Sequence, residues 1–504
     1  MLLSDLSASS AARHIAGSLV FLSLYLLGRV LYNIFLHPLR AYPGPKLWAA
    51  SRLPWIITSL RGDLAWSLLA LHERYGSVVR IAPDELSYTG AGDAWKKIYG
   101  RRGADEFVKC LDGRAIAGPN IRATAADGII SAPHDKHARL RRAVAPAFSE
   151  RALREQEDCL QLYTGKLMEQ LRRCCRDAGS GPQDMQRWYS LFAFDVMSDL
   201  AFGQAVGCLD NVDQPWLQVL GARTKSIVWY QVLIYYGLDR WAKYFTPASL
   251  MAARQKHVAM TSAKVQKRLQ QKEDRKDFIS YLLQNKTETL TNRELVMMAS
   301  SFIVAGSGTS SAALAGITYL LCKNPDKYKN LCDEVRSSFT SEAEITLEST
   351  SRLSYLKAVI EEGLRLYPPS PSTFPRFVPP GKGEEIEGQW VPGGVAVGVH
   401  QFSAGRMEHN FKNAKTFIPE RWLPLAAGAE FVNDNRAAMQ PFSYGPRNCI
   451  GVNMAYAEMR LVLARLLWNF DIELLDDQWM AKQKTWLVWH KIPLLINLKS
   501  VKAM

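Results

Sequence analysis

The chain has 504 residues, of which 48% are hydrophobic and 22% are charged, so it can bury a large core and is neither disordered nor fibrous. Its 62 Lys and Arg exceed its 48 Asp and Glu, giving a net charge of +14 that predicts an anionic partner: a nucleic acid, a membrane surface or an acidic protein. The eight cysteines form no CxxC pair, which argues against both a disulfide scaffold and a zinc site.

An apolar run at 15–36 is long enough to span a membrane, since about 20 apolar residues cross a bilayer as a helix. Arg29 interrupts the run, but its long side chain can reach the interface. Basic residues gather after the run, so the positive-inside rule places residues 1–14 in the lumen and the rest of the chain in the cytosol. A cleaved signal peptide is the alternative, and the lack of a small-residue cleavage site after the run argues against it.

A proline-rich neck is predicted at 37–45, because Pro43-Gly44-Pro45 favours a stiff, extended backbone. No further linker stands out, so residues 46–504 are expected to fold as one domain. The patterns predict a fold that is mainly α with small β-sheets, an α+β class. We expect helices at 64–76, 134–175, 184–204, 247–285, 291–321 and 450–469, another helix starting at Pro325, and strands at 77–82, 85–89 and within 370–400.

Three of these helices have a recognisable start. Asp63 is a residue type that caps helix N-termini. Thr291 and Glu294 have the spacing of a capping box. Pro325 suits the first turn of a helix, where a missing N–H costs nothing.

The stretch FSYGPRNCIG combines residues that suit a flat, anionic, metal-bearing ligand. Cys449 stands just before a predicted helix, whose N-terminus favours a thiolate over a thiol. Gly445 and Gly451 allow tight turns or a close approach to a macrocycle. Arg447 suits a carboxylate, and Phe442 offers the sulfur an apolar shield. A lone cysteine before a helix is usually an inert core residue, but this combination favours a metal ligand.

The same stretch resembles the haem-binding signature of the cytochrome P450 superfamily, F-x-x-G-x-R-x-C-x-G, at every fixed position. Three further motifs of the family match in the right chain order: AGSGTS at 305–310, EGLR at 362–365 and PERW at 419–422. The resemblance covers essentially the whole chain. It implies the cytochrome P450 fold, a haem b cofactor, Cys449 as the ligand of its iron, and Arg447 as a partner of a haem propionate.

Glu362 and Arg365 lie three residues apart, so they can pair on one helix face. If the pair were exposed, it would contribute only a few tenths of a kcal/mol. The resemblance implies more: Glu362, Arg365 and Arg421 form a buried ion network that locks the cysteine loop.

Two glycines, Gly306 and Gly308, interrupt a strong helical pattern at a cost of about 1 kcal/mol each. Close helix packing is one explanation, and a local opening beside a ligand fits the pair better. The resemblance implies that Thr309 steers protons to iron-bound oxygen, with Gly306 and Ser310 in the same catalytic motif. Many relatives carry an acid at the position of Gly308, so the relay here must use Thr309, Ser310, Ser307 or water.

Basic residues outside the cysteine loop have two proposed roles. His137 and Arg141 occupy the family's W-x-x-x-R positions, and with Arg376 they are candidates for the haem propionates, although a solvated cationic face is the simpler reading. The remaining basic residues, with Arg460, Lys482 and Lys484, predict a cationic face for an acidic NADPH-cytochrome P450 reductase. Nucleic acid is not expected as a partner, because no recognition module is present.

Family topology places the substrate pocket in stretches 105–131, 215–245, 297–309, 370–377 and 485–490. Their apolar and aromatic side chains predict a cavity for a neutral lipophilic small molecule. The candidate lining residues are Ile116, Ile121, Ile129, Trp229, Tyr230, Tyr235, Tyr236, Met298, Phe302, Phe374, Trp486 and Trp489.

The segments PRFVPPG, VPGG and HQ between 375 and 401 resemble fungal members that tailor secondary metabolites, such as trichothecene hydroxylases. We therefore expect a monooxygenase in the endoplasmic reticulum membrane that uses O2 and NADPH electrons delivered by the reductase. The alternatives are a haem-thiolate isomerase or dehydratase that does not use O2, and a non-catalytic haem protein.

Overall fold

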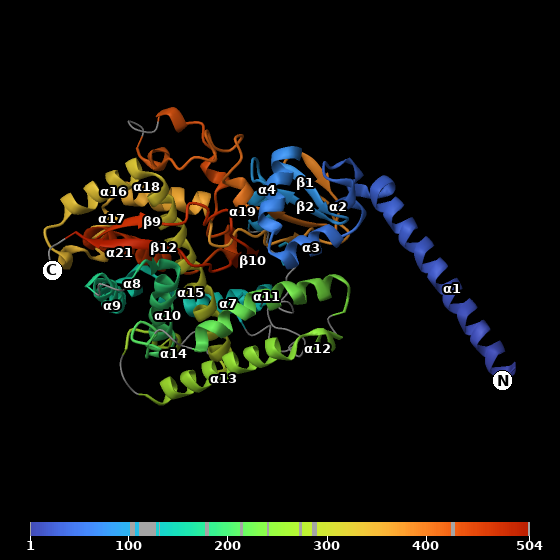
Figure 1. Cartoon of the computed structure of the whole chain (residues 1–504), viewed down its shortest axis with the longest axis horizontal. Coiled ribbons are helices and arrows are strands. Elements are labelled where there is room, and N and C mark those ends of the chain that lie inside the picture. Colours follow the sequence, from blue (N-terminus) through green and yellow to red (C-terminus); the bar gives the residue numbers. More distant parts are fainter. Residues whose placement is uncertain are drawn as a thin grey trace.

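The computed structural model describes residues 2–100, 106–109, 128–130, 132–176, 181–211, 215–238, 241–271, 275–284, 290–424 and 429–501. A long N-terminal helix, α1, projects from a helix-rich body that carries a β-sheet lobe next to it (Figure 1). The helices are α1 Leu2–Leu31, α2 Lys46–Ala50, α3 Leu53–Arg61, α4 Leu64–Tyr75, α5 Ala94–Tyr99, α7 His134–Val144, α8 Glu150–Glu155, α9 Glu157–Arg176, α10 Met185–Phe202, α11 Pro215–Tyr235, α12 Ala242–Phe245, α13 Ala248–Gln270, α14 Phe278–Gln284, α15 Asn292–Lys323, α16 Pro325–Ser338, α17 Leu347–Ser351, α18 Ser354–Leu366, α19 Gln401–Ala404 and α21 Val452–Asn469.

The strands are short, as expected from the sequence. They are β1 Val78–Ala82, β2 Glu85–Tyr88, β3 Val108–Lys109, β4 Gln183–Asp184, β5 Arg376–Phe377, β6 Glu384–Ile386, β7 Gln389–Val391, β8 Ala396–Val399, β9 Phe470–Leu474, β10 Thr485–Trp486, β11 Val488–Trp489 and β12 Leu495–Ser500. The largest sheet has the order β1-β2-β8-β5-β3, in which β2 pairs antiparallel with β1 and parallel with β8. This sheet carries Arg376 and Lys109 side by side on neighbouring strands.

Two helices of the described chain are long and apolar enough to cross a membrane. The segment 13–36 is only 6% buried and belongs to the projecting α1, whereas 292–323 is 56% buried and is the core helix α15. After α1, residues Pro38–Ala41 form a 3₁₀ turn. The expected extended neck is therefore partly wrong, because proline also suits the first position of such a turn.

The core helix α15 lies against α10, α18 and α21, and it positions much of the candidate site. Its start is the expected capping box: Thr291 Oγ1 accepts from the Glu294 N–H, and the Glu294 carboxylate accepts from the Thr291 N–H. α15 can approach its neighbours closely because it has glycine where they present bulky side chains. A Cβ on Gly316, for example, would lie 2.2 Å from the Tyr367 ring.

Two long predicted helices are broken in the structure. The pattern at 134–175 divides at a 3₁₀ turn, Ala145–Phe148, where Pro146 lacks an N–H, and Ser149 then caps α8. The pattern at 247–285 divides into α13 and α14, with a buried ion pair of 2.7 Å between Arg268 Nε and Asp277 Oδ2 across the break. Residue 285 lies outside the described residues.

The expected cap of α4 is also absent. The helix starts after Asp63, but this side chain makes no capping hydrogen bond. Asp63 Oδ1 instead lies 2.5 Å from Lys484 Nζ near the β10–β11 hairpin. A long-range ion pair has replaced the local interaction.

Candidate active site

The cysteine loop places an accessible sulfur at the start of α21. A short 3₁₀ turn, Gly445–Arg447, reverses the chain, and the Cys449 N–H donates to the Phe442 carbonyl at 2.8 Å. The Cys449 side chain is exposed, whereas Cys208 and Cys332 are buried. Although the side chain is accessible, the protein atoms around it partly desolvate the Cys449 thiol and raise its pKa. The Gly451 N–H and the charge of Arg141 act to lower this pKa. All seven cysteines that the structure describes are free thiols.

Glycine is required at one position of this loop by close packing. Gly445 has φ +74, and a Cβ there would lie 2.1 Å from the Tyr99 carbonyl oxygen. At Gly451 a Cβ would meet only Phe148 at 3.9 Å and the Cys449 sulfur at 4.0 Å. The Phe148 ring also packs 5.2 Å from that of Phe302 on α15, which connects the loop region to the core helix.

Two arginines hold the loop. Arg141 of α7 donates to the carbonyl and side-chain oxygens of Asn448, at 2.8 and 2.5 Å. Arg447 Nε lies 2.8 Å from Glu106 Oε1, and its Nη1 donates to the Ala132 carbonyl. No sequence pattern indicates Glu106, because its partner Arg447 is more than 300 residues away.

Further basic side chains lie around Arg447. Burial, with the charges of Arg376 and Arg447, lowers the pKa of Lys109 to about 7. Burial, with the charges of Arg447, Lys109 and Arg141, lowers the pKa of His137 to about 3. Arg376 is buried, with its guanidinium 5.6 Å from the centre of the Tyr99 ring. Lys109 was not expected from the sequence, because only the pairing of β3 with β5 brings it beside Arg376.

This donor set fits a haem. Several buried cations next to Glu106 suit a ligand with two carboxylates, such as the haem propionates. Among the described residues, no group of three or more His, Cys, Asp and Glu could hold a metal ion.

The predicted ion network is present and buried. Arg365 donates to both carboxylate oxygens of Glu362, at 2.8 and 2.6 Å, and Arg421 Nε lies 3.1 Å from Glu362 Oε1. Trp422 Nε1 and the Ile418 N–H donate to the same carboxylate. Although burial acts to raise it, the two arginines hold the pKa of Glu362 below its ordinary value.

The network reaches the segment that leads to the cysteine. Arg421 pairs with Asp434, and Arg436 donates to the Arg421 carbonyl. Trp95 Nε1 donates to the Ala438 carbonyl at 2.9 Å. These contacts fix the chain shortly before the cysteine loop begins.

On α15 the AGSGTS motif forms a continuous helix, so the expected local opening is wrong. A Cβ on Gly306 would lie 2.5 Å from the Met197 sulfur of α10, which means that this glycine serves close packing, whereas a Cβ on Gly308 would meet nothing within 4 Å. Thr309 Oγ1 donates to the Ala305 carbonyl at 2.6 Å. Ala305 is exposed although it lies in the middle of the core helix.

An acid that the sequence reading did not single out lies behind this motif. Glu458 of α21 is 1% exposed, and its carboxyl group hydrogen-bonds Ser310 of α15. Burial raises the pKa of Glu458 to about 7, against the effect of the Ser310 hydroxyl. A partly protonated acid therefore lies beside the AGSGTS motif.

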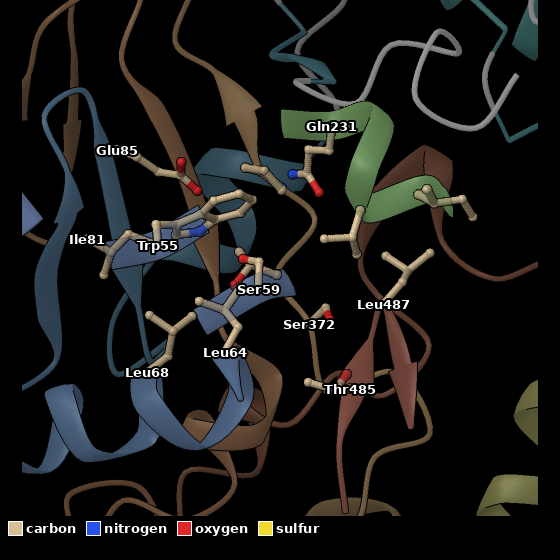
Figure 2. Close-up of a pocket in the computed structure, with 14 residues that line it drawn as sticks. Trp55, Ser59, Leu64, Leu68, Ile81, Glu85, Gln231, Ser372, Thr485 and Leu487 are labelled. Carbon is tan, nitrogen blue, oxygen red and sulfur yellow. The ribbon is translucent and has the colours of Figure 1, made fainter. Parts of the chain in front are cut away.

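A pocket opens between the β-sheet lobe and α11 (Figure 2). Its empty volume is about 570 Å³, part of it open to solvent. The lining residues come from α3, α4, β1, β2, α11, the 372–375 segment and the β10–β11 hairpin: Trp55, Ser59, Leu64, Leu68, Ile81, Glu85, Ile227, Val228, Gln231, Ser372, Thr373, Pro375, Thr485 and Leu487.

Three of the stretches expected to line a pocket do so, but the individual side chains differ from those expected. Met298 and Phe302 are buried in the core, and Trp489 stacks on Tyr367. The other candidates that the structure describes are also absent from the lining of this pocket: Ile129, Trp229, Tyr230, Tyr235, Tyr236, Phe374 and Trp486. Ile116 and Ile121 lie outside the described residues.

The proposed cationic docking residues are partly engaged within the chain. Lys482 Nζ lies 2.7 Å from Asp476 Oδ2, and Lys484 pairs with Asp63. Arg460 is half-buried on α21. Of the three, only Arg460 lies on the helix that follows the cysteine.

Comparison with known proteins agrees with this geometry. The cytochrome P450 family profile matches residues 42–498. Cytochrome P450 monooxygenase alt3 of Alternaria solani is 53% identical over 97% of this chain and 94% of its own length, and alt1 of the same organism is 47% identical over 94% and 92%. Averantin hydroxylase of Dothistroma septosporum is 41% identical over 95% of this chain and 90% of its own length.

The family profile and these relatives confirm the family and the reaction class that the sequence motifs indicated. The chain belongs to the cytochrome P450 family and is a haem-dependent monooxygenase.

Proposed function

We propose that Cys449 is the thiolate ligand of a haem b iron and that the surrounding cations hold its propionates. The observation that carries this proposal is the accessible sulfur at the start of α21 beside a buried cationic cluster. The cluster consists of Arg447, Arg141, Arg376 and Lys109, and the imidazole of His137, whose pKa of about 3 keeps it neutral, lies beside them as a hydrogen-bonding group. Phe442 packs on Tyr456, with ring centres 5.2 Å apart, so it lies on the loop as an apolar shield.

When bound, the haem supplies the iron at which O2 is activated. The protein's own contribution is to exclude water, hold the sulfur and deliver protons. Thr309 Oγ1, which donates to the exposed Ala305 carbonyl, and Ser310 Oγ, which lies against Glu458 of α21, are the hydroxyls to which we assign proton delivery. Gly306 supports this site by letting α10 and α15 approach each other.

The reaction proposed is insertion of one oxygen atom into a neutral lipophilic molecule of fungal secondary metabolism. The relative named averantin hydroxylase supports hydroxylation as the outcome. Electrons come from NADPH through NADPH-cytochrome P450 reductase. Residues 15–36 anchor the enzyme in the endoplasmic reticulum membrane, residues 1–14 lie in the lumen, and residues 46–504 form the cytosolic catalytic domain.

The thiolate assignment is tested with the reduced holoenzyme under carbon monoxide. We expect the red-shifted Soret absorption of a haem thiolate in the wild-type enzyme and its loss in Cys449→Ser. A normal spectrum in the variant would disprove the ligand assignment. Turnover with candidate metabolites should require the reductase and add one oxygen atom by mass spectrometry, whereas an isomerase would turn over without it.

A further inference from the structure

The pocket in Figure 2 contains more polar groups than a site for a plain hydrocarbon needs. Trp55 and Ser59 lie on one side of it and Leu487 lies on the opposite side. Gln231 of α11 lies between them. Leucine, isoleucine and valine side chains supply half of the remaining lining residues. The pocket is therefore apolar with a few convergent polar groups, the usual character of a small-molecule site.

Two of its hydroxyls lack a partner. Ser59 is 3% exposed, and its Oγ has no hydrogen-bond partner within the described part of the chain. The same holds for the buried Oγ1 of Thr373. Buried hydroxyls are nearly always hydrogen-bonded, so two unsatisfied ones that line the same pocket indicate a polar ligand.

The third polar group is the carboxylate of Glu85, which is 2% exposed and pairs with Arg52. The Arg52 guanidinium lies 3.9 Å from the centre of the Tyr235 ring, and Trp55 packs edge-on against the same ring at 5.4 Å. Arg52 is shared between Glu85 and the more exposed Asp84, so two carboxylates face one guanidinium at this wall and an anionic ligand is disfavoured. A neutral ligand whose hydroxyls can both donate and accept matches this wall.

We propose that this pocket is the hydroxyl-reading part of the substrate site, and that it takes an aromatic ring carrying phenolic hydroxyls. Ser59 and Thr373 hydrogen-bond these hydroxyls, Glu85 accepts from one of them, and the indole of Trp55 packs on the ring. This assignment rests on the proposed monooxygenase function. The segment Ser372–Pro375 leads directly into Arg376 of the cationic cluster, so it joins the pocket to the proposed haem site.

The test uses full-length holoenzyme and two photoreactive probes, 4,4′-dihydroxybenzophenone and unsubstituted benzophenone. After irradiation, peptide mass spectrometry locates the labelled segments. We expect the dihydroxy probe to label peptides of α3, α11 or the β10–β11 hairpin. In the double variant Ser59→Ala, Thr373→Val, its half-saturating concentration should rise about five- to tenfold, while labelling by benzophenone stays unchanged.

Thr58→Val is the matched control, because the neighbouring Thr58 Oγ1 already donates to the Pro54 carbonyl at 2.8 Å. This variant should bind the dihydroxy probe as the wild type does. The inference is wrong if the dihydroxy probe labels none of these peptides, or if its half-saturation is unchanged in the double variant. The carbon monoxide spectrum of the same samples tests the haem-thiolate assignment separately, so a normal spectrum without pocket labelling rejects only the present inference.

Discussion

Gly306 of α15 lies so close to Met197 of α10 that a Cβ on the glycine would be 2.5 Å from the methionine sulfur. Two residues further along, a Cβ on Gly308 would meet nothing within 4 Å. The two glycines of this motif therefore have different structural roles, although they look equivalent in the sequence. The first allows helix packing, and the second leaves space beside Thr309.

Alanine substitutions should separate these two roles. Gly306→Ala gains helix propensity but overpacks against Met197, so we expect a net loss of about 1–2 kcal/mol of stability. Gly308→Ala should be neutral or stabilising by up to ~1 kcal/mol. Thermal denaturation of the holoenzymes measures both. Adding Met197→Ala should reduce the damage in Gly306→Ala, and full additivity of the two losses would contradict the contact.

Removing the carboxylate of Glu362 should release the haem. Glu362→Gln leaves Arg365 buried without its counter-charge and leaves Arg421 with Asp434 alone, which costs roughly 3–5 kcal/mol. Haem content per mole of protein and Tm are the measurements. Glu361→Gln is the control, since it changes the adjacent carboxylate of the same helix, and a glutamine oxygen can still accept from Tyr456 Oη as Glu361 does at 2.9 Å. Full haem content in Glu362→Gln would show that the network does not support the haem site.

Glu458 should make stability depend on pH near neutrality. Its folded-state pKa is raised from 4.5 to about 7, so folding favours the protonated acid. Below about pH 4.5 the group is protonated in both states and does not lower the free energy of unfolding. As pH rises, ionisation in the unfolded state lowers that free energy. The loss is complete above about pH 7 and reaches roughly 3 kcal/mol. Glu458→Gln should therefore gain in Tm over the wild type as pH rises from 5.5 to 8.

The exposed Glu473 of β9 provides the comparison for that experiment. Glu473→Gln should differ from the wild type by the same small amount at every pH. A Tm difference for Glu458→Gln that is likewise independent of pH would show that the acid titrates normally in the folded enzyme.

The sequence was most informative where the signal is local. The capping box of Thr291 and Glu294, the pair of Glu362 with Arg365, and the strands flanking Pro83 all lie within a few residues, and all are present. The cysteine loop was recognisable because its function requires several residue types at fixed spacing. Tertiary contacts had no such signal.

Apart from the turns that proline causes at Pro38–Ala41 and Ala145–Phe148, the errors share one physical origin, which is that long-range contacts override local pattern. Asp63 looked like a cap but pairs with Lys484 of the distant hairpin. Lys109 joins the cationic cluster only through strand pairing.

Three of the five pocket stretches were placed correctly, yet their large aromatic residues do not line the pocket. Some are buried, such as Tyr230 and Trp489, and others are exposed, such as Tyr236 and Phe374. Smaller neighbours such as Thr373 and Leu487 line the pocket. Segment topology is predictable from the family, but the side of a segment that faces a cavity depends on packing.

Thr309→Ala should uncouple electron consumption from product formation. Without this hydroxyl, proton delivery fails and reducing equivalents are released as peroxide. Peroxide formed and product formed per NADPH are the measurements. Ser301→Ala is the control, because its Oγ makes the same hydrogen bond to the carbonyl four residues earlier, at 2.7 Å, two turns away. An unchanged ratio of product to NADPH in Thr309→Ala would exclude the role.

Lys109→Met should separate haem binding from protein stability. The Lys109 amine is buried beside Arg376 and Arg447, and it donates to the Ile130 carbonyl at 2.7 Å. If it pairs with a propionate, its loss should speed haem transfer to apomyoglobin by roughly tenfold. The haem-free protein should instead keep or gain Tm, because one buried like charge is removed. Lys97→Met, which breaks only the half-exposed pair with Glu384, should change neither rate nor Tm appreciably. Unchanged haem transfer in Lys109→Met would remove this lysine from the propionate site.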